Sequence, residues 1–130
     1  MAKLKNISRK HRLEIRIQIG DRRGEGADYG NLGTVFQSLG EYGKAKEYLE
    51  KALTIRKEIG DREGEGSCYG NLGTLFQHAG EYERAREYYE KALAIRSEIG
   101  DRKGEAADYV NLGNVFKYFD EHEKAKEKLS

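Results

Sequence analysis

The residues of this 130-residue chain that could do chemistry are its many glycines, its asparagines, three histidines and one cysteine. The stretch GEGSCYGNLG, residues 64–73, is rich enough in glycine to suggest a loop that cradles phosphate groups. Such a loop follows a β-strand, opens a helix and, in P-loop proteins, ends in Gly-Lys-Ser/Thr. Here a helical pattern comes first, the stretch itself has helical periodicity, and that ending is missing. The pattern therefore argues against a nucleotide site.

Metal and catalytic chemistry find no support either. His11, His78 and His122 have no metal-ligand spacing with one another or with Cys68. No nucleophile and base recur together, and the carboxylates fall on outer helix faces, several at the Glu-to-Lys spacing that supports a helix. We therefore expect no enzyme activity, no metal and no cofactor. The single cysteine also rules out an internal disulfide framework and fits a reducing, cytoplasmic compartment.

The composition predicts a helical protein with a thin core, since 37% of residues are hydrophobic, 36% are charged and none is proline. The formal net charge of +1 does not predict a nucleic-acid binder. The first 23 residues are locally basic, which leaves contact with nucleic acid or anionic lipid as a minor alternative. No apolar run approaches the ~18 residues that a membrane span needs, so we expect no membrane partner.

A repeat of 40 residues organises the chain. Residues 21–60 and 61–100 align without gaps, with about seven positions in ten identical. Residues 101–130 begin a third copy, and residues 1–20 match the tail of a copy. Repeats of this length form solenoids and arrays. We therefore expect a single repeat domain over residues 1–130 that starts and ends in mid-repeat.

Each unit contains two amphipathic helical patterns with apolar residues at spacings of three and four. Gly80 separates the two patterns of one unit, and Asp61 and Asp101 are N-cap candidates. After the turn of the third unit, residues Glu121–Ser130 form about half a helix, which we expect to fray or to dock on another chain. No stretch shows the period-two alternation of apolar and polar residues that is typical of a β-strand, so we expect no sheet. The predicted helices are 22–39, 42–59, 62–79, 82–99 and 102–119.

Glycine inside a helix costs about 0.5–1 kcal/mol relative to alanine. Close approach of two helix backbones would offset that cost. Gly33, Gly73 and Gly113 lie where the second helix of the same unit should press on the first. We interpret them as packing glycines.

The unit resembles the tetratricopeptide repeat. The residues that carry the resemblance are Tyr69, Leu72, Gly73, Phe76, Gly80, Tyr82, Ala85, Tyr89 and Ala92, with matching sets in the other units. Two departures stand out. The unit is longer than the usual length of about 34 residues, and Lys57 and Ser97 occupy the position of the usual proline. The third unit has Asp120 and His122 where the turn has Gly and Tyr.

The longer unit is similar to the repeats of the Leu-Gly-Asn polarity adaptors, whose arrays bind peptide segments of partner proteins. The resemblance implies an all-α, right-handed solenoid of about six or seven helices, with the first helix of each unit on a concave face. It also implies a non-catalytic scaffold that takes a protein or peptide partner in that groove. The groove residues are expected to be Asn31, Thr34, Gln37, Asn71, Thr74, Gln77, His78, Asn111, Asn114 and Lys117.

Asparagine suits this role because its side chain has both an acceptor and donors, so it can pair with the C=O and N–H of an extended peptide. The open alternative is that Asn31, Asn71 and Asn111 hydrogen-bond between adjacent repeats and set their stacking. The alternative to a peptide-binding function is a structural or engineered array without an evolved ligand. Such an array would associate with itself head to tail through its exposed terminal repeats.

Three further expectations concern charged or reactive residues. Lys5, Arg9 and Arg12 replace apolar residues of the repeat and would form a charged terminal cap. Cys68 matches Asp28 and Asp108 in the other units, so we expect it to be half exposed. Residues 22, 62 and 102 are arginines that follow the helix caps, and we expect solvation for them rather than a ligand.

Overall fold

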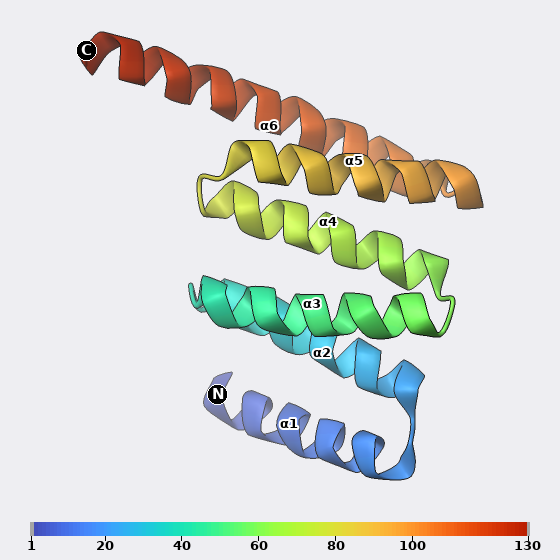
Figure 1. The fold of residues 1–130 in the computed structure, drawn as a ribbon. Helices are drawn as coiled ribbons and strands as arrows, with labels where there is room; N and C mark the ends of the chain where they lie inside the picture. The colour runs from blue at the N-terminus through green and yellow to red at the C-terminus, as the bar shows by residue number, and fades with distance from the viewer. Residues whose placement is uncertain (1, 130) are drawn as a thin grey trace.

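The computed structural model describes residues 2–129, with side chains from Ser8 onward, and this part of the chain consists of six α-helices without a β-strand. Figure 1 shows the helices stacked in chain order from α1 to α6, and each contacts mainly the next one along the chain. The predicted all-α solenoid is confirmed. The helices are α1 Ala2–Ile19, α2 Arg22–Ser38, α3 Tyr42–Glu58, α4 Arg62–His78, α5 Tyr82–Ile99 and α6 Arg102–Leu129.

Aspartates begin the first helix of each unit, as predicted. Asp61 Oδ1 accepts a hydrogen bond from the backbone N–H of Gly64 at 2.9 Å, and Asp101 accepts one from Gly104 at the same distance. This bond satisfies one of the free N–H groups of the first turn. The starts of α2 to α5 match the predicted positions, and their ends agree within one residue.

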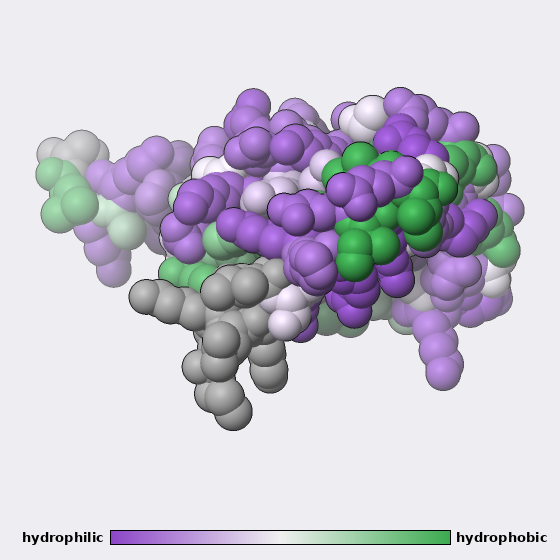
Figure 2. All heavy atoms as spheres, turned by 90° about the horizontal axis from the view of Figure 1, so that it is seen from below, coloured by the Kyte–Doolittle hydropathy of each residue, from purple (hydrophilic) through white to green (hydrophobic). Residues whose placement is uncertain are grey.

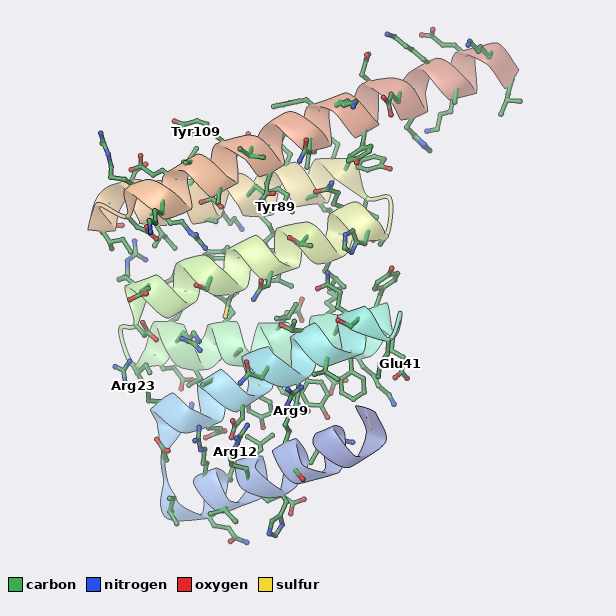
Figure 3. The ribbon with its side chains drawn as sticks, turned by 180° about the vertical axis from the view of Figure 1, so that it is seen from behind. Arg9, Arg12, Arg23, Glu41, Tyr89 and Tyr109 are labelled. Atoms are coloured by element: carbon green, nitrogen blue, oxygen red, sulfur yellow. The ribbon has the colours of Figure 1, made fainter. Side chains whose placement is uncertain are left out.

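The helices form two layers. In Figure 3, which views the molecule from behind, α2 lies in front of α3 and α6 lies in front of α5. The first helices α2, α4 and α6 form one layer, and the second helices α1, α3 and α5 form the other. The core lies between these layers. Leu32, Leu72 and Leu112, at 40-residue intervals, are buried there together with Leu49 of α3 and Tyr89 of α5.

Two of the three predicted packing glycines do hold a second helix close. A methyl group on Gly33 would lie 2.7 Å from Leu49 Cγ, and one on Gly73 would lie 2.8 Å from the Tyr89 ring. Both distances are shorter than any tolerable carbon–carbon contact. The prediction is wrong for Gly113, which has no such atom within 4 Å. The reason is that none of the described residues forms a second helix beside α6 at this point.

The third unit has no turn. The sequence predicted a helix over 102–119 and a separate half-helix from Glu121, but α6 is continuous from Arg102 to Leu129. In the other units the turn depends on Gly40 and Gly80, whose φ angles are +78° and +79°. A residue with a Cβ is strained at such angles, and the third unit has Asp120 at this place. The helix therefore continues, and its final half extends past α5 (Figure 1).

Aromatic pairs reinforce the two complete units. Tyr48 of α3 stacks on Phe36 of α2 with ring centroids 5.3 Å apart, and Tyr88 of α5 stacks on Phe76 of α4 at the same distance. Such pairs contribute about 0.5–1.5 kcal/mol beyond burial. The corresponding residue of α6, Phe116, lacks a stacked second-helix tyrosine and is exposed.

Arginines near the ends of the second helices reach across to the next unit. Arg96 Nε lies 3.4 Å from Asp108 Oδ2, and Arg16 Nε lies 3.5 Å from Asp28 Oδ2. At the middle junction Cys68 takes the place of the aspartate. Its exposure is 3%, so the predicted half-exposed thiol is wrong. Arg56, the arginine of this junction, is near enough to act electrostatically on the thiol and pairs with Asp61.

Helix α1 departs in part from the predicted charged cap. Arg12 Nε lies 3.2 Å from Asp28 Oδ1, and Figure 3 shows Arg9 and Arg12 between α1 and α2. The side chain of Lys5 lies outside the described residues. Apolar residues are exposed on α1 instead: Ile15, Ile17 and Ile19.

Candidate functional site

The first helices share one polar face, which we call the first-helix face. On α4 its residues follow one another at spacings of four, three and four, which places them on one side of a helix. Three of its four residues on α4 are exposed and Thr74 is half buried. The face consists of Ala27, Asn31, Thr34 and Ser38 on α2, of Ser67, Asn71, Thr74 and His78 on α4, and of Ala107, Asn111, Asn114 and Tyr118 on α6.

Asn31, Asn71 and Asn111, three of the four asparagines of this face, are not engaged by the described part of the protein. Asn31 and Asn71 are exposed and Asn111 is half buried. None of their side chains makes a hydrogen bond with any described residue, so the alternative of bonding between repeats has no support there. By contrast, Thr34 Oγ1 donates to the Gly30 carbonyl at 3.1 Å. The asparagine amides are therefore free donors and acceptors.

A side-chain contact between Gln37 and His78 connects the first helices α2 and α4. Gln37 Nε2 of α2 lies 3.3 Å from His78 Nδ1 of α4, so two residues predicted from separate units come together. The imidazole is a donor or an acceptor according to its tautomer. This contact joins neighbouring units at the end of the first helices near the turns.

Tyr89 of α5 orients two more predicted residues. Its hydroxyl lies 2.8 Å from Thr74 Oγ1 and donates to Gln77 Oε1 at 3.2 Å. Burial raises the pKa of Tyr89, so the hydroxyl stays protonated at neutral pH. The Gln77 amide is thus held by its oxygen, which leaves its NH₂ group to donate elsewhere. Sequence reasoning had assigned Tyr89 only to packing.

A pocket opens where the units α4–α5 and α6 meet. It has a volume of ≈ 240 Å³ and is lined by Gln77, His78, Tyr82 and Tyr118. The rings of Tyr82 and Tyr118 are stacked with centroids 6.3 Å apart. The pocket combines an aromatic wall with amide and imidazole groups. It can therefore take an apolar or aromatic side chain and hydrogen-bond the backbone beside it.

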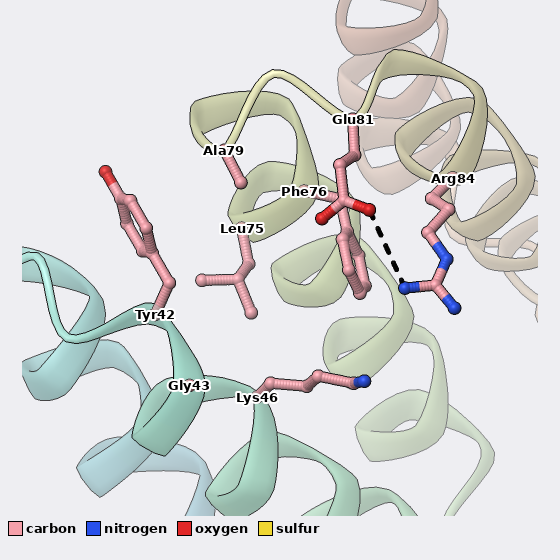
Figure 4. Close-up of a pocket in the computed structure, with 8 residues that line it drawn as sticks. All are labelled: Tyr42, Gly43, Lys46, Leu75, Phe76, Ala79, Glu81 and Arg84. Atoms are coloured by element: carbon pink, nitrogen blue, oxygen red, sulfur yellow. Dashed lines mark ion pairs between the residues drawn. The ribbon is translucent and has the colours of Figure 1, made fainter.

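A second pocket lies between α3 and the turn that joins α4 to α5 (Figure 4). Its volume is ≈ 180 Å³, and Arg84 within it pairs with Glu81 at 3.8 Å and lies 5.0 Å from the Phe76 ring centroid. None of the predicted groove residues lines it. Its lining residues are Tyr42, Gly43, Lys46, Leu75, Phe76, Ala79, Glu81 and Arg84.

The third unit extends the first-helix face but changes its chemistry. Asn114 and Lys117 of α6 are exposed and replace the threonine and glutamine of the other units. Within residues 2–129, no second helix of the same unit lies behind them. Tyr118 takes the place of His78 and contacts Tyr82 of the preceding unit. The face therefore gains an aromatic ring toward α6, and Lys117 adds a positive charge beside it.

The arginines considered for an acidic ligand are partly engaged inside the protein. Arg22 pairs with Glu58 and with Glu25, and Arg62 pairs with Glu98 and with Glu65. The pairs with Glu58 and Glu98 join the start of the first helix to the end of the second helix of the same unit, whereas the pairs with Glu25 and Glu65 lie within the first helix. Both arginine side chains remain exposed, at 44% and 42%, so the expected solvation holds alongside these ion pairs.

A metal site and a membrane span lack the residues that they would need in the part of the chain that the structure describes. Within residues 2–129, no cluster of histidine, cysteine, aspartate and glutamate side chains could hold a metal ion. None of the described helices is long and apolar enough to span a bilayer.

Sequence reasoning missed Tyr82 and Tyr89 as parts of the site. Tyr82 looked like a turn residue, because Tyr42 occupies the same place, and Tyr89 looked like a core residue. The sequence did contain one indication of a role for Tyr89, because the equivalent residue of the preceding unit is Leu49. A buried tyrosine usually finds a hydrogen-bond partner for its hydroxyl, which a leucine does not need. That signal names no partner without the structure.

The chain belongs to the tetratricopeptide repeat family, whose model matches residues 26–98 and 64–129. Proteins with these repeats generally mediate interactions between proteins and are typically non-catalytic scaffolds. No curated protein matches the sequence closely enough to count as a relative.

Solved structures support the same fold. BtubC (BKLC) from P. vanneervenii is 25% identical with a TM-score of 0.77, and the match covers 92% of this chain and 50% of that one. A putative kinesin light chain from Podosopora anserina, with nearly identical TPR-like repeats, is 20% identical with a TM-score of 0.65. That match covers 90% of this chain and 58% of the other. The chain thus spans about half the length of these proteins.

Proposed function

We propose that the chain is a binding module for an extended or partly helical peptide segment of a protein partner, which lies along the first-helix face. One observation carries the proposal. The amides of Asn31, Asn71 and Asn111 recur at 40-residue intervals on one face and make no hydrogen bond with any described residue.

A peptide without regular structure needs partners for its backbone groups when it leaves water. Each free asparagine amide offers one carbonyl oxygen and one NH₂ group, which suit a backbone N–H and C=O. The small residues Ala27 and Ser67 beside the asparagines leave space for the peptide backbone. The first-helix face can therefore hold a backbone of any sequence.

Selectivity would come from side chains at the α6 end of the face. The pocket of Tyr82, Tyr118, Gln77 and His78 accepts one apolar or aromatic side chain of the peptide. Lys117, exposed nearby on α6, favours an acidic residue next to it. We therefore propose a ligand peptide that carries an apolar anchor beside an acidic residue.

A peptide array probed with the purified chain tests this function. In the variant Asn71→Ala/Asn111→Ala, each bound peptide should lose about 1–3 kcal/mol of affinity, because its backbone groups lose their partners. Affinity is measured by fluorescence anisotropy on the peptides selected from the array, and circular dichroism shows that the helices remain.

The matched control is Gln18→Ala, which removes an exposed amide from α1 outside the first-helix face. This variant should bind the same peptides as the unchanged chain. Equal affinity of the asparagine double variant and the control would reject the asparagines as ligand contacts. Loss of affinity in both variants would argue that binding does not use this face.

We infer as a second function that the chain associates with itself. The observation that favours this is the exposure of apolar side chains at both ends of the stack, where Ile15 and Ile19 lie on α1, and Tyr109 and Phe116 lie on α6. Soluble monomers rarely leave such groups of apolar residues exposed. Sedimentation velocity over a concentration series tests it, since a mass that stays at one chain throughout contradicts self-association.

A further inference from the structure

The pocket between α3 and the α4–α5 turn lies apart from the first-helix face and has an apolar interior. Its volume is ≈ 180 Å³, and its lining includes Ala79 and the buried Leu75 of α4. Figure 4 shows Lys46 entering from α3 and Arg84 from α5. Each of these two cations already pairs with a nearby glutamate. The pocket therefore suits an apolar side chain of a ligand rather than a charged one.

Two exposed lysines farther along the same junction lack such a partner. Lys57 of α3 and Lys91 of α5 share one ring, since their Nζ atoms lie 5.4 and 5.6 Å from the centroid of Tyr69. Neither lysine forms an ion pair with any described residue. Glu65, whose charge acts on Lys57, is held by Arg62. Two ammonium groups therefore lie around one tyrosine without a carboxylate from the described residues to balance them.

The junction of α1 with the first unit has different residues at these places. There Lys51 takes the place of Lys91, and its Nζ lies 3.4 Å from Glu47 Oε1. Ile17 takes the place of Lys57 and is 47% exposed. Figure 2 shows apolar residues gathered over the C-terminal half of α1, where Ile17 lies. The unpaired lysines are thus a property of the junction between α3 and the unit α4–α5, which has described helices on both sides.

We propose that the pocket and the two lysines form a binding surface for a peptide segment in which an apolar residue and an acidic residue stand three positions apart. The apolar side chain enters the pocket, and the carboxylate binds the two ammonium groups. This site is separate from the first-helix face, because it uses the second helices and other residues of α4. We call it the α3–α5 strip, which consists of Phe76 and Ala79 at the pocket, Tyr88 in the middle, and Lys57, Tyr69 and Lys91 at the other end.

Charge complementarity selects an acidic residue for the lysine end of the strip. Hydrogen bonds between an ammonium group and a carboxylate are roughly twice as strong as neutral ones. The Tyr69 hydroxyl adds a third donor. Its hydrogen bond with Lys57, which raises the pKa of that lysine, occupies the tyrosine oxygen as an acceptor, because an ammonium group only donates. The hydroxyl proton of Tyr69 is then available to the carboxylate.

The spacing of three positions follows from α4, the helix beneath the strip. Phe76 at the pocket and Tyr69 at the lysines are seven residues apart, which is about 10 Å at the helical rise of roughly 1.5 Å per residue. An extended peptide advances about 3.3 Å per residue, so three steps cover this distance.

The middle of the strip disfavours an acidic residue. Tyr88 stacks there on Phe76 with ring centroids 5.3 Å apart. Burial raises the pKa of Tyr88, and the negative charges of Glu50 and Glu87 raise it further, which places both carboxylates near this ring. They would repel a carboxylate of the peptide. The two residues between the apolar anchor and the acidic residue should therefore be neutral or basic.

An NMR titration of the ¹⁵N-labelled chain tests the strip. The probe is a peptide blocked at both ends, with the sequence Glu-Ser-Ser-Leu-Ser-Ser-Glu, which offers a glutamate three positions from leucine in either chain direction. The amide signals of Tyr69, Ala79, Tyr88 and Lys91 should shift as the peptide is added. A peptide with glutamine in place of both glutamates should bind about three- to tenfold more weakly, the effect of one or two exposed ion pairs.

Three variants at exposed positions locate the two ends of the peptide, and circular dichroism verifies that each keeps its helices. Lys57→Gln/Lys91→Gln should weaken binding of the probe about three- to tenfold, as the loss of the glutamates does. Ala79→Leu places a larger side chain at the pocket and should also weaken binding. Leucine suits this position, because Leu39 occupies it in the first unit. The matched control is Lys51→Gln, which removes the lysine equivalent to Lys91 and should leave the affinity unchanged.

Equal affinity for the glutamate and glutamine peptides, or of the double lysine variant and the control, would overturn the acidic site. Shifts confined to the surroundings of Asn71 and Asn111 would place the probe on the first-helix face and overturn the α3–α5 strip. The absence of shifts up to the solubility limit of the peptide would overturn the strip as well. That result would leave the first-helix face untouched, since peptides selected from the array test it separately.

Discussion

Arg96 of α5 reaches Asp108 of α6 across the junction of two repeat units, with Nε 3.4 Å from Oδ2. The carboxyl group is 2% exposed, and its Oδ2 atom makes no hydrogen bond with a described residue. Burial therefore raises the pKa of Asp108 above its ordinary value of 3.8, and the attraction of Arg96 lowers it only in part. A buried ion pair of this kind orients two units without adding much stability.

This raised pKa predicts a distinct dependence of stability on pH. The folded state holds the Asp108 proton more tightly than the unfolded state, so the contribution of Asp108 is largest below pH 3.8 and declines as the pH rises through the raised pKa. The difference in unfolding free energy between the unchanged chain and Asp108→Asn should fall over this interval and be flat above it. Urea unfolding at a series of pH values measures it. A difference that grows with pH would mean that the Arg96 pair outweighs burial.

Cys68 should react slowly with thiol reagents in the folded protein. Burial raises the pKa of its thiol from 9.0 to about 11. Two pKa units reduce the thiolate fraction near neutral pH by about a hundredfold, and the thiolate is the reactive form. Reaction with Ellman's reagent at pH 8 should therefore be fast only after addition of urea. Equal rates in the folded and unfolded chain would contradict the burial.

The same thiol should affect stability at alkaline pH. Because its folded pKa exceeds the unfolded one, its contribution to stability is complete below pH 9.0 and is lost as the pH rises toward about 11. The variant Cys68→Ser lacks this loss. The measurement is the unfolding free energy of both chains between neutral and alkaline pH, and parallel curves would refute the prediction.

Gly73 and Gly113 occupy equivalent positions and should respond to alanine in opposite directions. A methyl group on Gly73 would lie 2.8 Å from the Tyr89 ring, so Gly73→Ala should destabilise the fold. Overpacking of this kind costs about 1–3 kcal/mol. Gly113 has no such neighbour within 4 Å. There alanine should stabilise α6 by about 0.5–1 kcal/mol, because it favours the helix. Urea unfolding at low protein concentration separates the two, and equal effects would show that a helix covers Gly113.

The continuity of α6 can be measured as a distance. In a chain with Cys68→Ser, spin labels at Gly113→Cys and Leu129→Cys should report backbones about 24 Å apart, the rise of 16 helical residues. Adding Asp120→Gly and His122→Tyr restores the turn residues of the other units and should bring the backbones within about 10 Å, the spacing of packed helices. Double electron–electron resonance measures both. A short distance before the turn is restored would contradict the straight helix.

The sequence by itself determined the period, the bounds of α2 to α5 and the nature of the turns in the two complete units. Asp61 and Asp101 cap helices, and Gly40 and Gly80 end them, through backbone angles and bonds within a few residues. Such features depend on local geometry, which a single sequence displays directly. The recurrence of the same letters in each unit also identified which faces are apolar and which are polar.

Only the tertiary structure decided what each face meets. Cys68 occupies the position of Asp28 and Asp108, and all three residues are buried where consecutive units pack together, although an aspartate at this place had suggested exposure. Gly113 looked identical to Gly33 and Gly73 but has no second helix on it, and Arg12 turned toward Asp28. Repeated letters predict repeated local structure. Contacts depend in addition on whether a neighbouring helix is present, and at the two ends of a solenoid that condition changes.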